Sequence, residues 1–132
     1  MPAGDAFTAS ERHEIDKAIR DAETVSRFEF SVFVGTSEGE TGPFARRLHS
    51  ALTAPDRSVL VMVDPAARIL EIVTGKDVRR HLTDSEVRLA AIAMETDFAV
   101  GNLAAGICNG LHLLSEHARS HEMLHVTEDT HS

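Results

Sequence analysis

An unbroken apolar run, Val59 to Val63, most constrains what this chain can fold into. Successive side chains of a β-strand point to opposite faces of the sheet, so such a run predicts a strand that is covered on both faces. Asp64 and Pro65 then favour a tight turn, because proline presets φ and aspartate accepts local backbone hydrogen bonds. A second apolar run follows from Ile69 to Val73. The sequence therefore predicts an antiparallel hairpin with helices on both sides.

Two segments have the S/T-x-x-E spacing of a helix capping box, Thr8 to Glu11 and Thr83 to Glu86. In this motif the hydroxyl and the carboxylate each satisfy a backbone N–H at the start of a helix. Apolar residues recur at helical spacing after each box. We therefore expect one helix from about Ser10 to Ser26 and another that ends before Gly101.

The remaining elements follow from similar patterns. Phe28 to Gly35 alternates only in part, which is typical of a strand at the edge of a sheet. A short helix is expected to begin at Pro43, since proline suits a first helical turn. The last long helix is predicted from Leu103 to about Arg119, and its Gly106-x-x-x-Gly110 spacing allows tight packing on a neighbouring helix.

The predicted element order is α-β-α-β-β-α-α, which indicates a three-layer α/β/α sandwich with a small mixed sheet. A helix connects the first strand to the hairpin, so this strand should lie parallel to one hairpin strand. Within the 132 residues we expect a flexible arm over residues 1–7, a single domain over residues 8–119 and a polar, frayed tail over residues 120–132.

The formal net charge of −8 argues against nucleic acid and anionic membranes as partners, because both would repel the chain. The sequence shows no signal peptide and no apolar run long enough to span a bilayer, so we expect a cytoplasmic protein. The single cysteine, Cys108, excludes an intramolecular disulfide and lies among apolar residues, which is typical of a buried, inert thiol.

Two motifs resemble ligand-binding sites, but each also has a simpler structural explanation. The loop from Gly35 to Gly42 connects a strand to a helix, where phosphate sites occur, yet it lacks the P-loop lysine and carries two glutamates. We expect a mobile surface loop. His117, His121 and His125 are spaced by four and would share one helix face that could bind zinc or nickel. They lie at the chain end, and no cysteine or carboxylate is clearly placed to complete a site.

His49 and His81 each follow a pair of arginines. Such histidines could act as acid–base groups beside an anion site. They are also typical of solvated helix ends, where the helix dipole favours a positive charge. Both interpretations stay open at this point.

Several short motifs support a resemblance to a known family. They are Asp56–Val63, Arg68–Gly75, Leu82–Asp84, Phe98–Gly106 and Gly110–Leu111. On these residues the chain resembles the TPM domain family, the domain of thylakoid lumen acid phosphatases, a photosystem II repair protein and a modulator of acetylcholine receptors. It looks especially like a compact actinobacterial subfamily of unknown function.

The resemblance implies an α/β/α sandwich, acid phosphatase activity and calcium or another divalent cation bound at acidic loop residues. The positions that correspond here are Asp56 and Asn102. Asp77 and Asp97 are further metal candidates, because they fall near predicted element ends and could converge with Asp56 in space. The chain departs from the family because it lacks the Trp-Gly-x-Gly segment with its acidic residues, and because Asn102 stands where a carboxylate is usual. A hard cation prefers that charge.

The sequence therefore favours a non-catalytic binding or accessory domain that acts through a protein partner or a small ligand. The alternative is a metal-dependent acid phosphatase, and a third possibility is a metal sensor or carrier that uses the C-terminal histidines. Convergence of Asp56 with Asp77 or Asp97 in a pocket would favour the enzyme. A flat apolar patch on an outer helix would favour a protein partner.

Overall fold

The computed structural model describes the backbone of residues 7–131 and the side chains of residues 7–119. The described chain forms helices and strands in the predicted order: α2 (Ala9–Ser26), β1 (Glu29–Val34), α3 (Thr41–Ser50), β2 (Ser58–Asp64), β3 (Ile69–Thr74), α4 (Asp84–Ala99) and α5 (Leu103–His131). Two short 3₁₀ turns flank the hairpin, η1 (Pro55–Arg57) before β2 and η2 (Val78–Arg80) after β3.

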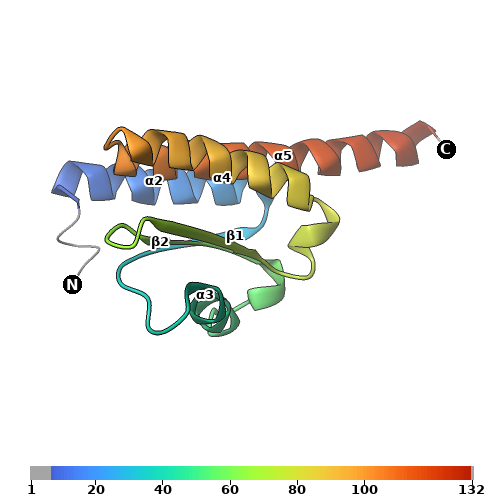
Figure 1. Ribbon diagram of the computed structural model, residues 1–132. Coiled ribbons are helices and arrows are strands. Elements are labelled where there is room, and N and C mark those ends of the chain that lie inside the picture. The colour runs from blue at the N-terminus through green and yellow to red at the C-terminus, as the bar shows by residue number, and fades with distance from the viewer. Residues whose placement is uncertain (1–6, 132) are drawn as a thin grey trace.

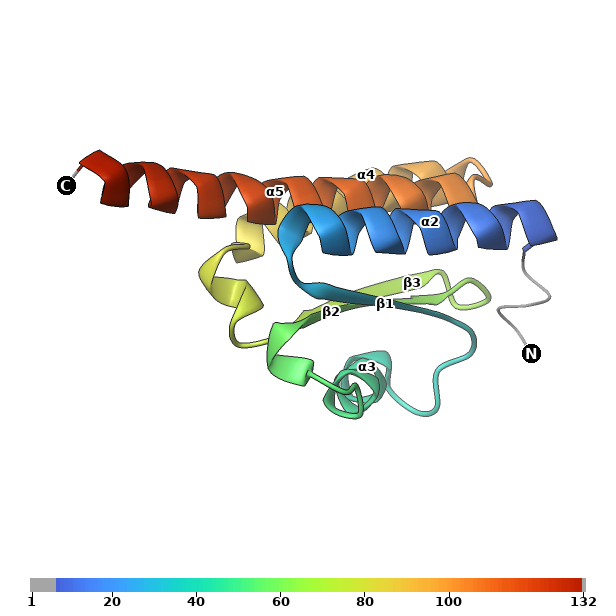
Figure 2. The same cartoon turned by 180° about the vertical axis from the view of Figure 1, so that it is seen from behind.

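The elements form the predicted three-layer α/β/α arrangement around a mixed sheet. Helices α2, α4 and α5 cover one face of the sheet and α3 covers the other (Figure 1). Figure 2 shows the same layers from behind, with α2 and α5 above the sheet and α3 below it. The strand order is β1-β2-β3, with β1 parallel to β2 and β2 antiparallel to β3. The predicted parallel pairing of the first strand is thus confirmed.

Strand β2 is buried along its whole length, as its unbroken apolar run predicted. Val59, Val61 and Val63 belong to the large core between the sheet and the three helices. Leu60 and Met62 point the other way, into a smaller core beneath α3. The two cores follow directly from the alternation of side chains along one strand.

Both capping boxes are present, at Thr8 with Glu11 and at Thr83 with Glu86. Two predicted boundaries were wrong. Helix α3 begins at Thr41 rather than at Pro43, so the proline lies within the first turn, where it is tolerated. Helix α5 continues to His131 rather than ending near Arg119, because no glycine or proline follows that would stop it.

The Gly106-x-x-x-Gly110 motif packs against α4, as predicted. A Cβ atom added at Gly106 would lie 2.7 Å from Cε1 of Phe98, and one at Gly110 would lie 2.5 Å from Cγ of Met94. The two glycines therefore let α4 and α5 approach closely. In the part of the chain that the structure describes, no helix combines the length and the hydrophobicity of a membrane span.

Candidate functional site

A hollow with a mostly apolar lining lies where the β2–β3 turn faces the junction of α4 and α5, and we call it the hairpin cleft. Its volume is about 350 Å³. Its lining residues are Val63, Asp64, Pro65, Arg68, Ile69, Leu70, Glu95, Phe98, Ala99, Gly101 and Leu103. The cleft lies beyond the carboxyl end of β2, which is where open α/β sheets commonly bind ligands.

The helical wall of the cleft depends on how α4 ends. Gly101 has φ of 85°, a conformation that glycine adopts without strain. The N–H of Asn102 donates to the carbonyl of Asp97 at 2.9 Å, and the N–H of Gly101 donates to that of Phe98 at 3.0 Å. These two bonds form a Schellman motif, which reverses the chain and brings Phe98 and Leu103 to the same wall.

The strand side of the cleft is fixed by the buried carboxylate of Asp64, which is 3% exposed. Its Oδ1 accepts from the N–H of Ala67 at 3.1 Å, as the turn prediction required, and its Oδ2 accepts from the N–H of Ser37 at 3.1 Å. Asp64 therefore ties the Gly35–Gly42 loop to the hairpin. One of the backbone donors that a phosphate cradle would need is already occupied.

Two charged side chains remain available at the rim of the cleft. Arg68 and Glu95 are both exposed. Neither forms an ion pair with another residue whose side chain is described. Arg68 also has φ of 58°, so its side chain projects from a left-handed position at the end of the turn. The cleft thus combines an apolar interior with one positive and one negative group at its mouth.

The four predicted oxygen ligands fall into two pairs at opposite ends of β2. Asp56 lies in η1, before the strand, and its carbonyl accepts from the N–H of Asp77 at 2.9 Å. Asp97 and Asn102 lie beside the hairpin cleft, after the strand. The Oδ2 of Asp97 accepts from Nδ2 of Asn109 at 3.1 Å, which secures the end of α4 to α5. The structure therefore brings together the members of each pair, but not all four.

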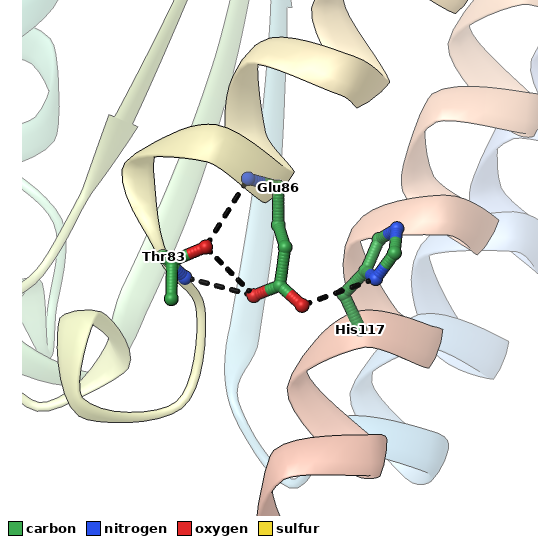
Figure 3. A network of polar contacts seen from close by, with 3 residues as sticks. All are labelled: Thr83, Glu86 and His117. Atoms are coloured by element: carbon green, nitrogen blue, oxygen red, sulfur yellow. Dashed lines mark hydrogen bonds and ion pairs between the residues drawn. The ribbon is translucent and has the colours of Figure 1, made fainter.

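His117, the first of the three spaced histidines, contacts the second capping box (Figure 3). Its Nδ1 lies 3.3 Å from Oε2 of Glu86. The Oε1 of Glu86 accepts from the N–H of Thr83 at 2.9 Å and from its hydroxyl at 3.1 Å. This network joins α4 to α5. The side chains of His121 and His125 lie outside the described residues.

No group of three or more His, Cys, Asp or Glu side chains within the described part is arranged to hold a metal ion. The metal assignments made from the sequence stay predictions. The two remaining histidines have different surroundings. His49 is buried and its Nε2 lies 3.0 Å from the carbonyl oxygen of Ser58. His81 is half-buried, with its ring 5.5 Å from that of Phe28.

Three large apolar side chains are exposed on or next to α4. Leu89 is 59% exposed, Ile92 is 53% exposed and Val100 is 72% exposed. Their spacing of three and eight residues places them along one side of the helix and its C-terminal end. A few exposed apolar side chains are common on protein surfaces, and only larger contiguous patches mark an interaction site. These three side chains are therefore weaker support for a protein partner than the hairpin cleft is for a small ligand.

Comparison with known proteins identifies the family. A family model described as "Domain of unknown function (DUF5130)" matches residues 2–115. The chain belongs to this family. Two curated relatives from Mycobacterium tuberculosis, "Uncharacterized protein MT2543" of strain CDC 1551 / Oshkosh and "Uncharacterized protein Rv2468c" of strain ATCC 25618 / H37Rv, are each 26% identical over 109 residues. The match covers 83% of this chain and 65% of each relative.

Solved structures share the fold. The BA42 protein of Bizionia argentinensis matches with a TM-score of 0.78 and 23% identity, over 87% of this chain and 83% of that one. The N-terminal domain of cg2496 from Corynebacterium glutamicum matches with a TM-score of 0.70 and 17% identity, over 85% of this chain and 74% of that one. At these identities the likeness concerns the fold alone.

The resemblance to the TPM domain family was wrong, because the family that matches is DUF5130. The motifs that suggested it include an Arg-containing turn, a strand that ends in glycine and a helix that restarts after glycine. Each has a local physical reason in this structure. Asp64 bonds to the turn, Gly75 allows a close backbone approach, and Gly101 adopts a positive φ. Such features recur wherever a chain makes these turns.

Proposed function

We propose that this domain is a non-catalytic binding module that takes a small ligand in the hairpin cleft. The observation that carries the proposal is the combination of an apolar cleft of about 350 Å³ with two charged side chains at its rim that form no ion pair with described residues. Small-molecule sites are typically concave, mostly apolar and about 300–1,000 Å³, with a few polar groups that orient the ligand.

The lining indicates which chemical class of ligand fits. Ile69, Leu70, Phe98 and Leu103 would cover an apolar body. Arg68 would pair with an acidic head group, because its guanidinium forms two parallel hydrogen bonds with a carboxylate or sulfonate. The proposed ligand is therefore a small apolar acid. Glu95 on the opposite wall disfavours a second negative charge, which adds selectivity.

A fluorescence titration with 1-anilinonaphthalene-8-sulfonate, an apolar sulfonate, tests the proposal, with octanoate and octanol as competitors. Ala99→Trp fills the cleft from the exposed end of α4 and should weaken binding by at least about tenfold, which corresponds to about 1.4 kcal/mol. Ala105→Trp places the same side chain at another exposed helical position outside the lining and should change nothing.

Arg68→Asn tests the head group separately, since asparagine tolerates the positive φ at this position. It should weaken octanoate and leave octanol unchanged. Circular dichroism of each variant confirms that the native fold is retained. Equal binding by Ala99→Trp and Ala105→Trp, or no saturable binding by the native chain, would contradict the proposal.

The contacts favour neither the metal-dependent acid phosphatase nor a histidine metal carrier over the ligand module. The two predicted pairs of oxygen ligands are separated by the length of β2, and His117 pairs with Glu86. A phosphatase would need such groups clustered around one reacting phosphate.

A further inference from the structure

A second hollow lies at the other end of the sheet, where η1 and η2 meet the start of β1. Its volume is about 290 Å³. Its polar lining includes Arg27, Arg57, Asp77, Arg80 and His81, and we call it the arginine pocket. Arg57 immediately precedes β2, whereas the hairpin cleft begins at the end of that strand. The two hollows are therefore independent sites.

Arg57 is held in place before any ligand arrives. Its Cζ lies 5.0 Å from the centre of the Phe28 ring, and its Nη2 donates to the carbonyl of Arg27 at 2.8 Å. Phe28 is only 6% exposed, so the ring is a rigid platform. A guanidinium has five N–H donors, and this hydrogen bond uses one of them. The remaining donors are available with little loss of side-chain entropy on binding.

The same aromatic ring also positions His81, whose ring centre lies 5.5 Å from that of Phe28 at an angle of 50°. An arginine and a histidine from two separate segments are thus brought against one ring. His81 is also one of the lining residues of the pocket, and an imidazole ring carries an N–H donor. The lining of this one hollow thus draws donors from three segments, the end of α2, η1 and the end of η2.

The positive charges in the pocket are not neutralised by neighbouring side chains. None of Arg27, Arg57 and Arg80 forms an ion pair within 4.0 Å with a described side chain. Asp77 is the one carboxylate in the lining, and it forms no such pair either. The lining therefore carries three guanidinium groups and one carboxylate, in a chain whose formal net charge is −8.

Two backbone features keep these segments together. Gly75 is buried against η1, and a Cβ at this position would lie 2.5 Å from the carbonyl carbon of Asp56. Arg27 has φ of 68° at the end of α2, where glycine is the usual residue. The carbonyl that this conformation presents is the one that binds Arg57. The same conformation also allows the chain to turn from α2 into β1.

We propose that the arginine pocket binds a small oxyanion, the phosphate or carboxylate group of a metabolite. Arginine recognises both groups by parallel hydrogen bonds in one plane. The pocket is large enough for a phosphate with a small substituent, and its lining is predominantly polar. Asp77 would oppose the bound charge, so it limits the affinity and favours ligands that also offer a donor near it.

An NMR titration of the ¹⁵N-labelled full chain tests the proposal, with pyrophosphate in one arm and citrate in the other, both at constant ionic strength. We expect saturable shifts of the backbone amides in η2 and at Arg27 and Arg57. A stronger response to pyrophosphate would assign phosphoryl ligands, and a stronger response to citrate would assign carboxylates. Either result supports an oxyanion site.

A charge-matched pair of variants separates the pocket from general electrostatics. Arg57→Gln with Arg80→Gln should weaken binding by at least about tenfold, because both changes remove charge-assisted hydrogen bonds to the oxyanion. Arg46→Gln with Arg47→Gln makes the same change of net charge on α3, at exposed positions outside the pocket, and should have little effect. Equal weakening by both pairs would overturn the proposal.

Two single variants guard against loss of fold. Arg80 makes no described side-chain hydrogen bond or ion pair, so Arg80→Gln should fold normally and still weaken binding. Asp77→Asn should strengthen binding several-fold by removing the opposing charge. A native chain that gives no saturable shifts, or an Asp77→Asn variant that binds more weakly while it keeps its fold, would contradict the proposal. Neither result would affect the hairpin cleft.

Discussion

The packing of η1 against the end of β3 predicts that Gly75→Ala destabilises the protein. Gly75 is buried, and an added Cβ would collide with the carbonyl oxygens of Pro55 and Asp56. Backbone atoms cannot rotate away as a flexible side chain can, so η1 itself must move. That movement would strain two hydrogen bonds of 2.9 Å, from the N–H of Gly75 to Ser58 and from the N–H of Asp77 to Asp56.

The magnitude follows from three terms. Overpacking typically costs about 1–3 kcal/mol. Each hydrogen bond that is lost adds about 1 kcal/mol. The lower backbone entropy of alanine in the unfolded chain offsets about 0.4–1 kcal/mol of this loss in the free energy of unfolding. We therefore expect Gly75→Ala to lower the free energy of unfolding by about 2–4 kcal/mol.

Urea denaturation followed by circular dichroism at 25 °C measures this change, and Gly42→Ala is the matched control. Gly42 lies in the first turn of α3, and its added Cβ would meet only a guanidinium nitrogen of Arg46 at 3.4 Å. That variant should be neutral or stabilising by up to about 1 kcal/mol. A Gly75→Ala variant as stable as Gly42→Ala would refute the close approach that shapes the arginine pocket.

Three further predictions concern single side chains. Thr83→Ala removes the capping box that holds Glu86 and should lower the free energy of unfolding by about 0.5–2 kcal/mol in thermal denaturation; an unchanged melting temperature would contradict the network. Asp64→Asn replaces an acceptor with a donor that faces a backbone N–H and should cost about 1–3 kcal/mol in urea denaturation; equal stability would show that the carboxylate is not a clamp. Burial raises the pKa of the Cys108 thiol, and the Glu14 carboxylate adds to the rise, so the folded state favours the neutral thiol. The stability that the neutral thiol contributes is fully present below the pKa of the unfolded thiol and is lost as the pH rises through the pKa of the folded thiol. Alkylation of Cys108 near pH 8 should be slower in native than in unfolded protein. Equal rates would contradict this.

The fold was largely predictable because its determinants are local. The unbroken run of β2 required cover on both faces, and the two capping boxes marked the starts of α2 and α4. Each of these signals lies within a few residues of the element that it specifies. The two wrong boundaries, at the start of α3 and the end of α5, lie where the sequence has no strong stop or cap.

The candidate sites were less predictable because they depend on contacts between distant segments. Arg57 donates a hydrogen bond to the carbonyl of Arg27, thirty residues away in sequence, and no pattern in either segment predicts that contact. Ile69 and Phe98 were assigned correctly to a strand and a helix, but the cleft between them depends on the positive φ of Gly101, which reverses the chain after α4. The one useful signal was the arginine pair before His81, whose second member lines the arginine pocket.

Methyl NMR of the full chain tests the central claim, ligand binding in the hairpin cleft, most directly. Octanoate would be titrated into protein with ¹³C-labelled isoleucine and leucine methyl groups. The account predicts saturable shifts at Ile69, Leu70 and Leu103, and none at Leu89 and Ile92 on the outer face of α4. Shifts at Leu89 and Ile92 alone, or none at all, would contradict it.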